Sequence, residues 1–230
     1  MSQLALFFLL SLALYFVSRK TIHACFYFFS RFLKHPQAAY RMIALLYFPG
    51  TAVHEMSHLV MAMILNLKVR DIALIPKVRG NNLKLGTVTY EKRDVVSGLI
   101  VGIAPFFVAL FAFWLIDAFR LLYVNFWTTA LFSYIVFTVS STMFSSKQDL
   151  IDLIYVIPIV GIIGVVFMLL KIDLHLFFVT FDFNAISRFF SIVNSFLIFS
   201  LLMNGGMIMV LKLILKIQRG WEFYLLSALR

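Results

Sequence analysis

Long apolar runs, separated by short clusters of charged residues, occupy most of the chain. Each run is long enough to cross the hydrocarbon core of a bilayer as a helix, which takes about 20 residues. The pattern therefore predicts an all-α polytopic membrane protein with about six transmembrane helices. The predicted spans are residues 2–18, 42–67, 96–116, 126–144, 150–170 and 187–217.

Three segments within this map carry finer signals. Residues 19–41 mix basic and aromatic side chains, which suits a helix that lies at the membrane interface or enters it obliquely. The Pro-Gly pair at 49–50 predicts a kink or restart inside the second run, with Thr51 as the N-cap of the helix that follows. In the sixth run, the Asn-Gly-Gly sequence at 204–206 is compatible with a helix interruption, and Gly205 and Gly206 favour close helix packing.

Residues 68–94 differ from the apolar runs on either side. Two stretches rich in β-branched residues flank a turn-like sequence at 79–82. This arrangement predicts a small β-hairpin directly after the second run. Because unpaired backbone groups cannot face lipid, we expect the hairpin at the membrane surface or against the rest of the protein.

Composition agrees with a membrane environment. Apolar residues make up 63% of the chain and charged residues 13%, against about 45–50% and about 25% in soluble domains. No hydrophilic stretch is long enough for a separate soluble domain, so residues 1–230 are expected to form one integral membrane domain. The net charge of +10 comes from basic residues between the apolar runs, which favours contact with the lipid bilayer over nucleic acid. We expect a multi-pass protein of the plasma (inner) membrane of a prokaryote.

The second run contains the sequence His-Glu-Met-Ser-His at 54–58. In a helix, His54 and His58 project from one face, where their ring nitrogens can bind one Zn²⁺ at about 2.0–2.1 Å. Glu55 can then act as a general base on a water whose pKa the metal lowers towards about 7. With 5 His in 230 residues, chance would produce this pattern in about one such chain per thousand. The sequence therefore predicts a zinc site.

Two histidines leave this site one protein ligand short, since catalytic zinc usually has three. Asp149 is the preferred third ligand because it follows a polar interruption after the fourth run. Asp152, one helical turn later, is its nearest rival, and a role for Asp149 as the N-cap of the fifth helix is the alternative. The remaining candidates are Asp117, Asp173, Asp182, Glu222, His23, His35 and His175.

These features resemble the site-2 protease family of intramembrane zinc metalloproteases. The first motif of that family, HExxH, is matched at 54–58. Its second motif, NxxPxxxxDG, supplies an aspartate as the third zinc ligand. Aligned on Asp149, this chain keeps the spacing and the aspartate. The substituted positions are Ser141 for Asn, Phe144 for Pro and Leu150 for Gly.

The Gly-Ile-Ala-Pro sequence at 102–105 is similar to the small-residue and proline motif of the family's middle core helix. Pro105 itself, like Pro158, predicts a helix kink rather than a site residue. The resemblance covers about residues 40–155. It implies a compact member of the family with His54, His58 and Asp149 as the zinc ligands.

The resemblance implies a zinc-dependent intramembrane endopeptidase, which hydrolyses peptide bonds in or near transmembrane segments of membrane protein substrates. The hairpin could receive an unwound substrate by strand addition. One alternative is a catalytically inactive protease-like membrane protein that binds partner helices, although such a protein has no need of Glu55. The other is a metal transporter, which would need acidic or histidine residues spread over several spans, and few exist here.

Overall fold

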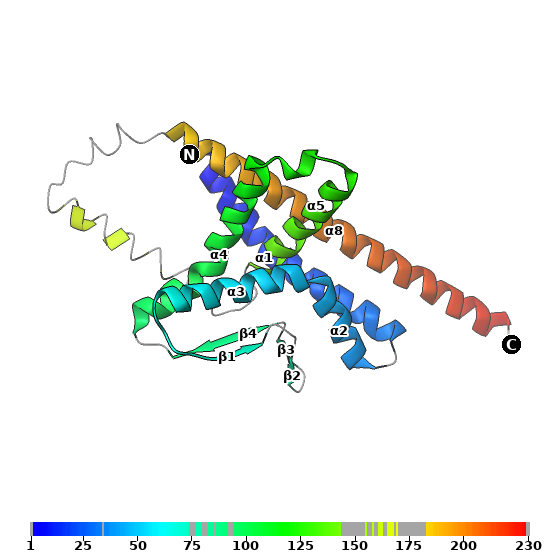
Figure 1. Cartoon of the computed structure of the whole chain (residues 1–230). Coiled ribbons are helices and arrows are strands. Elements are labelled where there is room, and N and C mark those ends of the chain that lie inside the picture. Colours follow the sequence, from blue (N-terminus) through cyan, green and yellow to red (C-terminus); the bar gives the residue numbers. More distant parts are fainter. Residues whose placement is uncertain are drawn as a thin grey trace.

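The computed structural model is mostly helical, with a small antiparallel sheet beside one helix (Figure 1). The predicted class, a helical protein with a small hairpin after the HExxH helix, is confirmed. The structure describes residues 2–33, 35–73, 77–79, 82–84, 86–91, 94–143 and 183–228, together with isolated positions between 155 and 169.

The first helix, α1 (Ser2–Phe32), continues well beyond the predicted end of the first span. Residues 19–32 therefore continue the first helix and do not form a helix of their own, and their place at the membrane interface stays a prediction. The inward face of α1 stays packed on α8 (Phe183–Ala228): Thr21 is fully buried, and the Cys25 Sγ lies 3.5 Å from the Met207 Sδ. Arg19 places its guanidinium 4.7 Å from the Tyr15 ring centroid, so its charge is accommodated without breaking the helix.

The predicted second span is divided into two helices, α2 (Pro36–Leu46) and α3 (Phe48–Ile64). The break lies at Tyr47, two residues before the predicted position. Proline fits in the first turn of α3 because the amide hydrogen it lacks has no partner there. Thr51 is consequently inside the helix, where its hydroxyl donates to the Tyr47 carbonyl at 3.0 Å, and the N-cap prediction is wrong.

The predicted hairpin is present as two short antiparallel pairs. β1 (Val69–Ala73) pairs with β4 (Thr87–Tyr90), and β2 (Lys77–Arg79) pairs with β3 (Asn82–Lys84). In Figure 1 the strand β4 lies between α3 and β1. The base of the sheet is held by Val69 and Tyr90, which pack against a buried cluster of Ala62, Leu67 and Val101.

Two further helices complete the part of the bundle before residue 144. α4 (Val95–Ala118) begins with a capping box between Asp94 and Ser97 and contains Pro105. A short 3₁₀ turn, η1 (Leu121–Tyr123), leads to α5 (Phe126–Thr142), which is N-capped by Asn125.

α8 is continuous across 204–206, so no interruption occurs there, and a Cβ added at Gly205 or Gly206 would have no atom within 4 Å, so close packing at these glycines is absent too. Asn204 is fully buried, and its amide donates to the Ser200 carbonyl at 2.8 Å and to the Ser141 hydroxyl of α5 at 3.0 Å. A polar side chain that is bonded both within its own helix and to a neighbouring one supports the helix through the two glycines.

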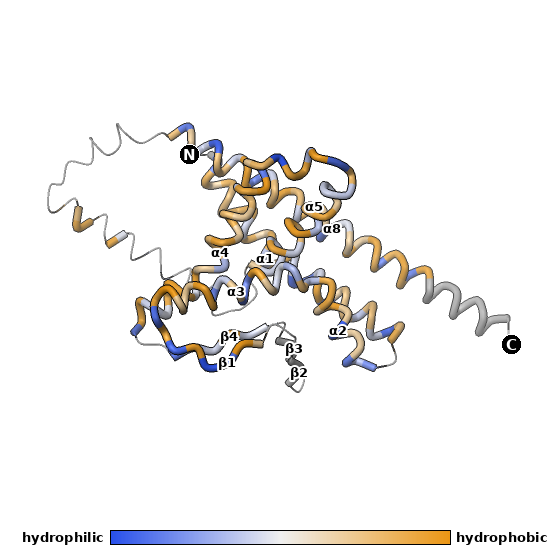
Figure 2. Tube along the Cα trace, in the orientation of Figure 1, coloured by the Kyte–Doolittle hydropathy of each residue, from blue (hydrophilic) through white to orange (hydrophobic). Residues whose placement is uncertain are grey.

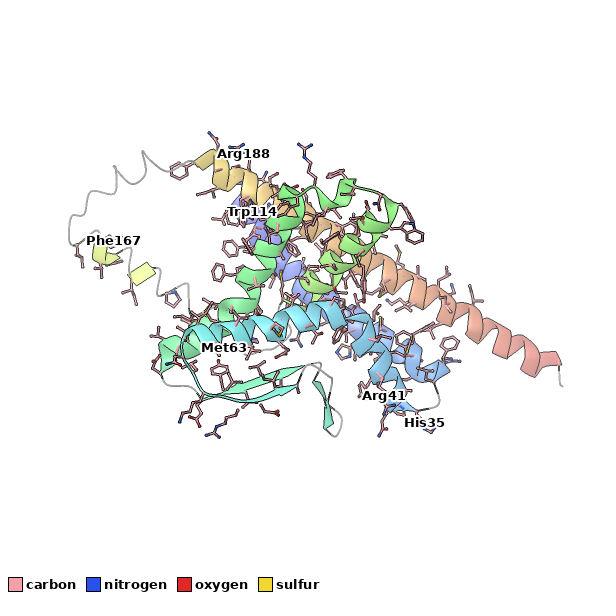
Figure 3. The ribbon with its side chains drawn as sticks, viewed as in Figure 1. His35, Arg41, Met63, Trp114, Phe167 and Arg188 are labelled. Carbon is pink, nitrogen blue, oxygen red and sulfur yellow. The ribbon has the colours of Figure 1, made fainter. Side chains whose placement is uncertain are left out.

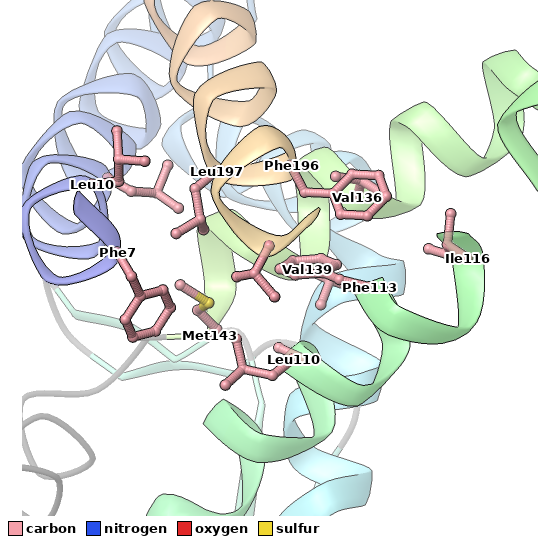
Figure 4. Packing of buried hydrophobic residues seen from close by; sticks show 13 residues of the cluster. Phe7, Leu10, Leu110, Phe113, Ile116, Val136, Val139, Met143, Phe196 and Leu197 are labelled. Atoms are coloured by element: carbon pink, nitrogen blue, oxygen red, sulfur yellow. The ribbon is translucent and has the colours of Figure 1, made fainter. Parts of the chain in front are cut away.

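The largest hydrophobic core lies where α1, α4, α5 and α8 meet, and Figure 4 shows side chains from all four helices interdigitating there. This core joins the N-terminal half of α1 to the N-terminal half of α8 and fixes α4 and α5 between them. The fully or nearly fully buried members include Phe7, Leu14, Ala109, Phe113, Val136, Val193 and Leu197.

Three helices of the described chain are long and apolar enough to cross a membrane, namely Gln3–Phe32, Val95–Ala118 and Phe183–Ile217. Figure 2 shows that most residues along α4 and α8 are hydrophobic, whereas β1 contains strongly hydrophilic ones. These spans match the predicted first, third and sixth. α3 and α5, with 17 residues each, lie within the predicted second and fourth spans, but neither is among the described helices long enough to cross a membrane. The predicted fifth lies mostly outside the described residues.

Candidate metal centre

The middle of α3 carries the residues predicted to form the zinc site. His54 and Glu55 are buried, with 4% and 6% of their surfaces exposed, and His58 is half-buried. Burying such groups in an apolar helix is costly unless they are hydrogen-bonded, paired or bound to a ligand, and ionisable residues within membrane segments commonly have a function.

The two imidazoles converge on one point. The Nε2 atoms of His54 and His58 lie 3.2 Å apart, with the ring planes at 85° to each other. Two nitrogens bound to one tetrahedral zinc at about 2.0–2.1 Å stand about 3.3 Å apart. The pair therefore has the separation that a shared Zn²⁺ requires, and the donor type suits this metal.

A second contact orients His58. Its Nδ1 lies 2.8 Å from the Val101 carbonyl oxygen of α4. A carbonyl can only accept a hydrogen bond, so Nδ1 of the neutral ring carries the proton and donates it. The Nε2 lone pair is left facing His54. This is the arrangement in which metal-bound histidines are commonly held, with the second ring nitrogen donating to an oxygen.

The residue just before β4 is in close contact with the Glu55 side chain. Gly86, immediately before β4, approaches so closely that a Cβ atom there would lie 2.9 Å from both Cδ and Oε1 of Glu55, and nearer still to Cγ. Carbon atoms in favourable contact are about 3.5–4.0 Å apart. A side chain at this position would push Glu55 aside, so the backbone of Gly86 limits the positions that the carboxyl group can take.

On the opposite side, α5 packs against the start of α3. A Cβ at Gly50 would lie 2.6 Å from the Thr142 Oγ1 and would overlap the Thr138 carbonyl. Gly50 is one helical turn before His54, so this close approach brings the C-terminal end of α5 next to the histidines. Asp149 comes six residues after Met143, the last described residue of this segment.

Three of the other predicted ligands lie on other elements or far along α4. His23 and His35 are exposed, and neither belongs to α3 or α4. Asp117 lies 16 positions along α4 from Val101, a distance of about 24 Å. Among the described residues, no group of three His, Cys, Asp or Glu side chains could hold a metal ion. Six predicted ligands have side chains outside the described residues: Asp149, Asp152, Asp173, His175, Asp182 and Glu222.

The sequence also contained signals for residues that were not singled out. A glycine beside a strand often marks a close approach of backbone to another group, which is the role of Gly86. A small residue one turn before a helical site residue is typical of close helix packing, as at Gly50. The Val101 carbonyl could not have been found in this way, because a backbone oxygen leaves no residue-type signal.

No family model, no curated protein and no solved structure matches this chain.

Proposed function

We propose that this chain is a zinc-dependent intramembrane endopeptidase that hydrolyses peptide bonds in or near transmembrane segments of membrane protein substrates. The observation that carries the proposal is the 3.2 Å approach of two Nε2 atoms beside a buried glutamate. The second role of His58, donation from Nδ1 to Val101, supports it because it fixes the ring for metal binding.

His54 and His58 would hold the metal, with Asp149 as the proposed third ligand. When bound, Zn²⁺ supplies a Lewis acid that lowers the pKa of a water molecule and polarises a carbonyl. Glu55 takes the proton of the water as it attacks the peptide carbonyl, and passes it to the departing amine. The burial of Glu55 excludes bulk water from this proton transfer.

The surroundings of the site suit a membrane protein substrate. A peptide bond in a lipid-embedded helix is already hydrogen-bonded, so the enzyme must offer an unwound segment new backbone partners. The β1–β4 sheet lies against α3, and Gly86, just before β4, contacts Glu55, so a strand begins beside the proposed general base. Addition of the unwound substrate to this sheet would bring its backbone close to Glu55.

Metal analysis of the purified wild-type protein in detergent tests the proposal directly. We expect about one zinc per chain, cleavage of a reconstituted transmembrane substrate, loss of cleavage on chelation, and recovery when zinc is added back. Wild type without zinc would contradict the proposal, and zinc without cleavage would favour the inactive or transport function.

Replacing Gly86 with alanine is expected to reduce the turnover number by about 10²-fold, because a misplaced catalytic group loses its alignment with the reacting bond. The clash involves the flexible end of Glu55 rather than backbone, so zinc content and thermal stability should be preserved. Cleavage rate, zinc content and the melting temperature measure these three effects.

Gly205→Ala is the matched control, because a Cβ there has no atom within 4 Å. It should leave cleavage unchanged. Full activity of Gly86→Ala would show that Glu55 tolerates displacement and that the contact with the strand has no catalytic importance.

A further inference from the structure

The hydrogen bond that orients His58 depends on an irregularity in α4. In an α-helix the amide of residue i donates to the carbonyl of residue i−4. The carbonyl of Val101 would therefore receive its hydrogen bond from the amide of residue 105. Residue 105 is a proline inside the helix, and proline has no amide hydrogen to donate.

The acceptor that Pro105 leaves without its helical donor is the atom that His58 uses. The Val101 oxygen lies 2.8 Å from the His58 Nδ1. Val101 is fully buried and Pro105 lies on the buried side of α4. A buried carbonyl without a donor costs free energy. The imidazole N–H of α3 therefore satisfies a group that the proline has made available.

Resting on the proposed zinc site, we infer that Pro105 is a positioning residue for the metal centre. By removing the amide that would bond to Val101, it reserves that carbonyl for His58. The carbonyl then fixes the proton on Nδ1 and directs Nε2 towards His54. The sequence predicts a kink at this proline. The role inferred here is different: it concerns the contact between α4 and His58 of α3.

Replacing Pro105 with alanine is expected to lower zinc affinity without lowering the melting temperature. Pro105→Ala restores the backbone amide, which competes with His58 for the Val101 carbonyl. The change also removes a proline from a helix interior, where proline is unfavourable. The metal site should therefore weaken while the helix itself does not.

The experiment measures zinc affinity by chelator competition and the melting temperature of the metal-free protein, both in detergent. For Pro105→Ala we expect zinc affinity to fall by about 10–100-fold, the usual effect of removing a partner that orients a metal ligand. The melting temperature should be no lower than that of wild type. Pro36→Ala is the matched control, because Pro36 is exposed at the first position of α2 and should affect neither quantity.

A third measurement separates this inference from the proposed function. Nitrogen NMR of histidine-labelled, metal-free protein reports which ring nitrogen of His58 carries the proton. We expect the Nδ1–H form in wild type and a mixture of both forms in Pro105→Ala. If wild type binds no zinc, the proposed function fails while the NMR still tests the role of Pro105.

Two results would overturn the inference. One is an unchanged zinc affinity and an unchanged His58 tautomer in Pro105→Ala. The other is a melting temperature that falls together with the affinity, which would assign the proline to the stability of the fold rather than to His58.

Discussion

Replacing Glu55 with glutamine is expected to reduce cleavage by about 10²–10⁴-fold while zinc remains bound, since this is the usual contribution of a general base. Glutamine has nearly the same shape as glutamate, so it keeps the contact with Gly86, but its amide cannot accept the proton of the attacking water. Both histidines remain in place. Cleavage of a reconstituted substrate and metal analysis of the same sample provide the two readings.

Glu91→Gln is the matched control for this variant. Glu91 is exposed beside the sheet and accepts a hydrogen bond from the Arg70 Nε at 2.9 Å. An exposed ion pair contributes little to stability, so cleavage should remain at the wild-type level. A Glu55→Gln protein that cleaves at the wild-type rate would rule out Glu55 as the base. A transport function would likewise predict no specific dependence on this carboxylate.

Replacing either His54 or His58 with alanine is expected to abolish stoichiometric zinc binding and, with it, cleavage. Each imidazole provides one of the two converging nitrogens, and the other nitrogen alone cannot retain the metal against a competing chelator. His35→Ala is the control, because His35 is exposed at the connection between α1 and α2 (Figure 3). Retention of one zinc per chain in His54→Ala would mean that the metal binds elsewhere.

The same metal analysis identifies the third ligand. Asp149→Ala should lose zinc and Asp152→Ala should keep it if the spacing of the second motif holds. The opposite result would assign the ligand to Asp152, and loss in neither variant would exclude both aspartates.

The parts of the fold that could be predicted are those set by local pattern. The apolar run at 96–116 and the turn sequence at 79–82 correspond closely to α4 and to the β2–β3 pair. The errors occurred where tertiary contacts override local signals. Basic residues after position 18 suggested that the first helix ends there. The helix instead continues to Phe32, because side chains such as Cys25 pack against α8.

The site shows the same division. Helical spacing alone brought His54 and His58 together, because both lie on one helix. The contacts of Val101 and Gly86 with the site depend on how α4 and β4 pack against α3. Those positions are far away in sequence, and no local pattern encodes their approach.

If α3 and α5 cross the membrane, as the sequence predicts, their shortness has a consequence for the surrounding lipid. At 17 residues each helix is about 26 Å long, whereas the hydrocarbon core is about 30 Å thick. A bilayer adapts to short helices by thinning around them. The lipid beside the histidines would then be locally compressed, and the headgroup region with its water would lie nearer to Glu55. Under the proposed hydrolytic function, hydrophobic mismatch would thereby help to supply water, the second substrate of hydrolysis, to the site.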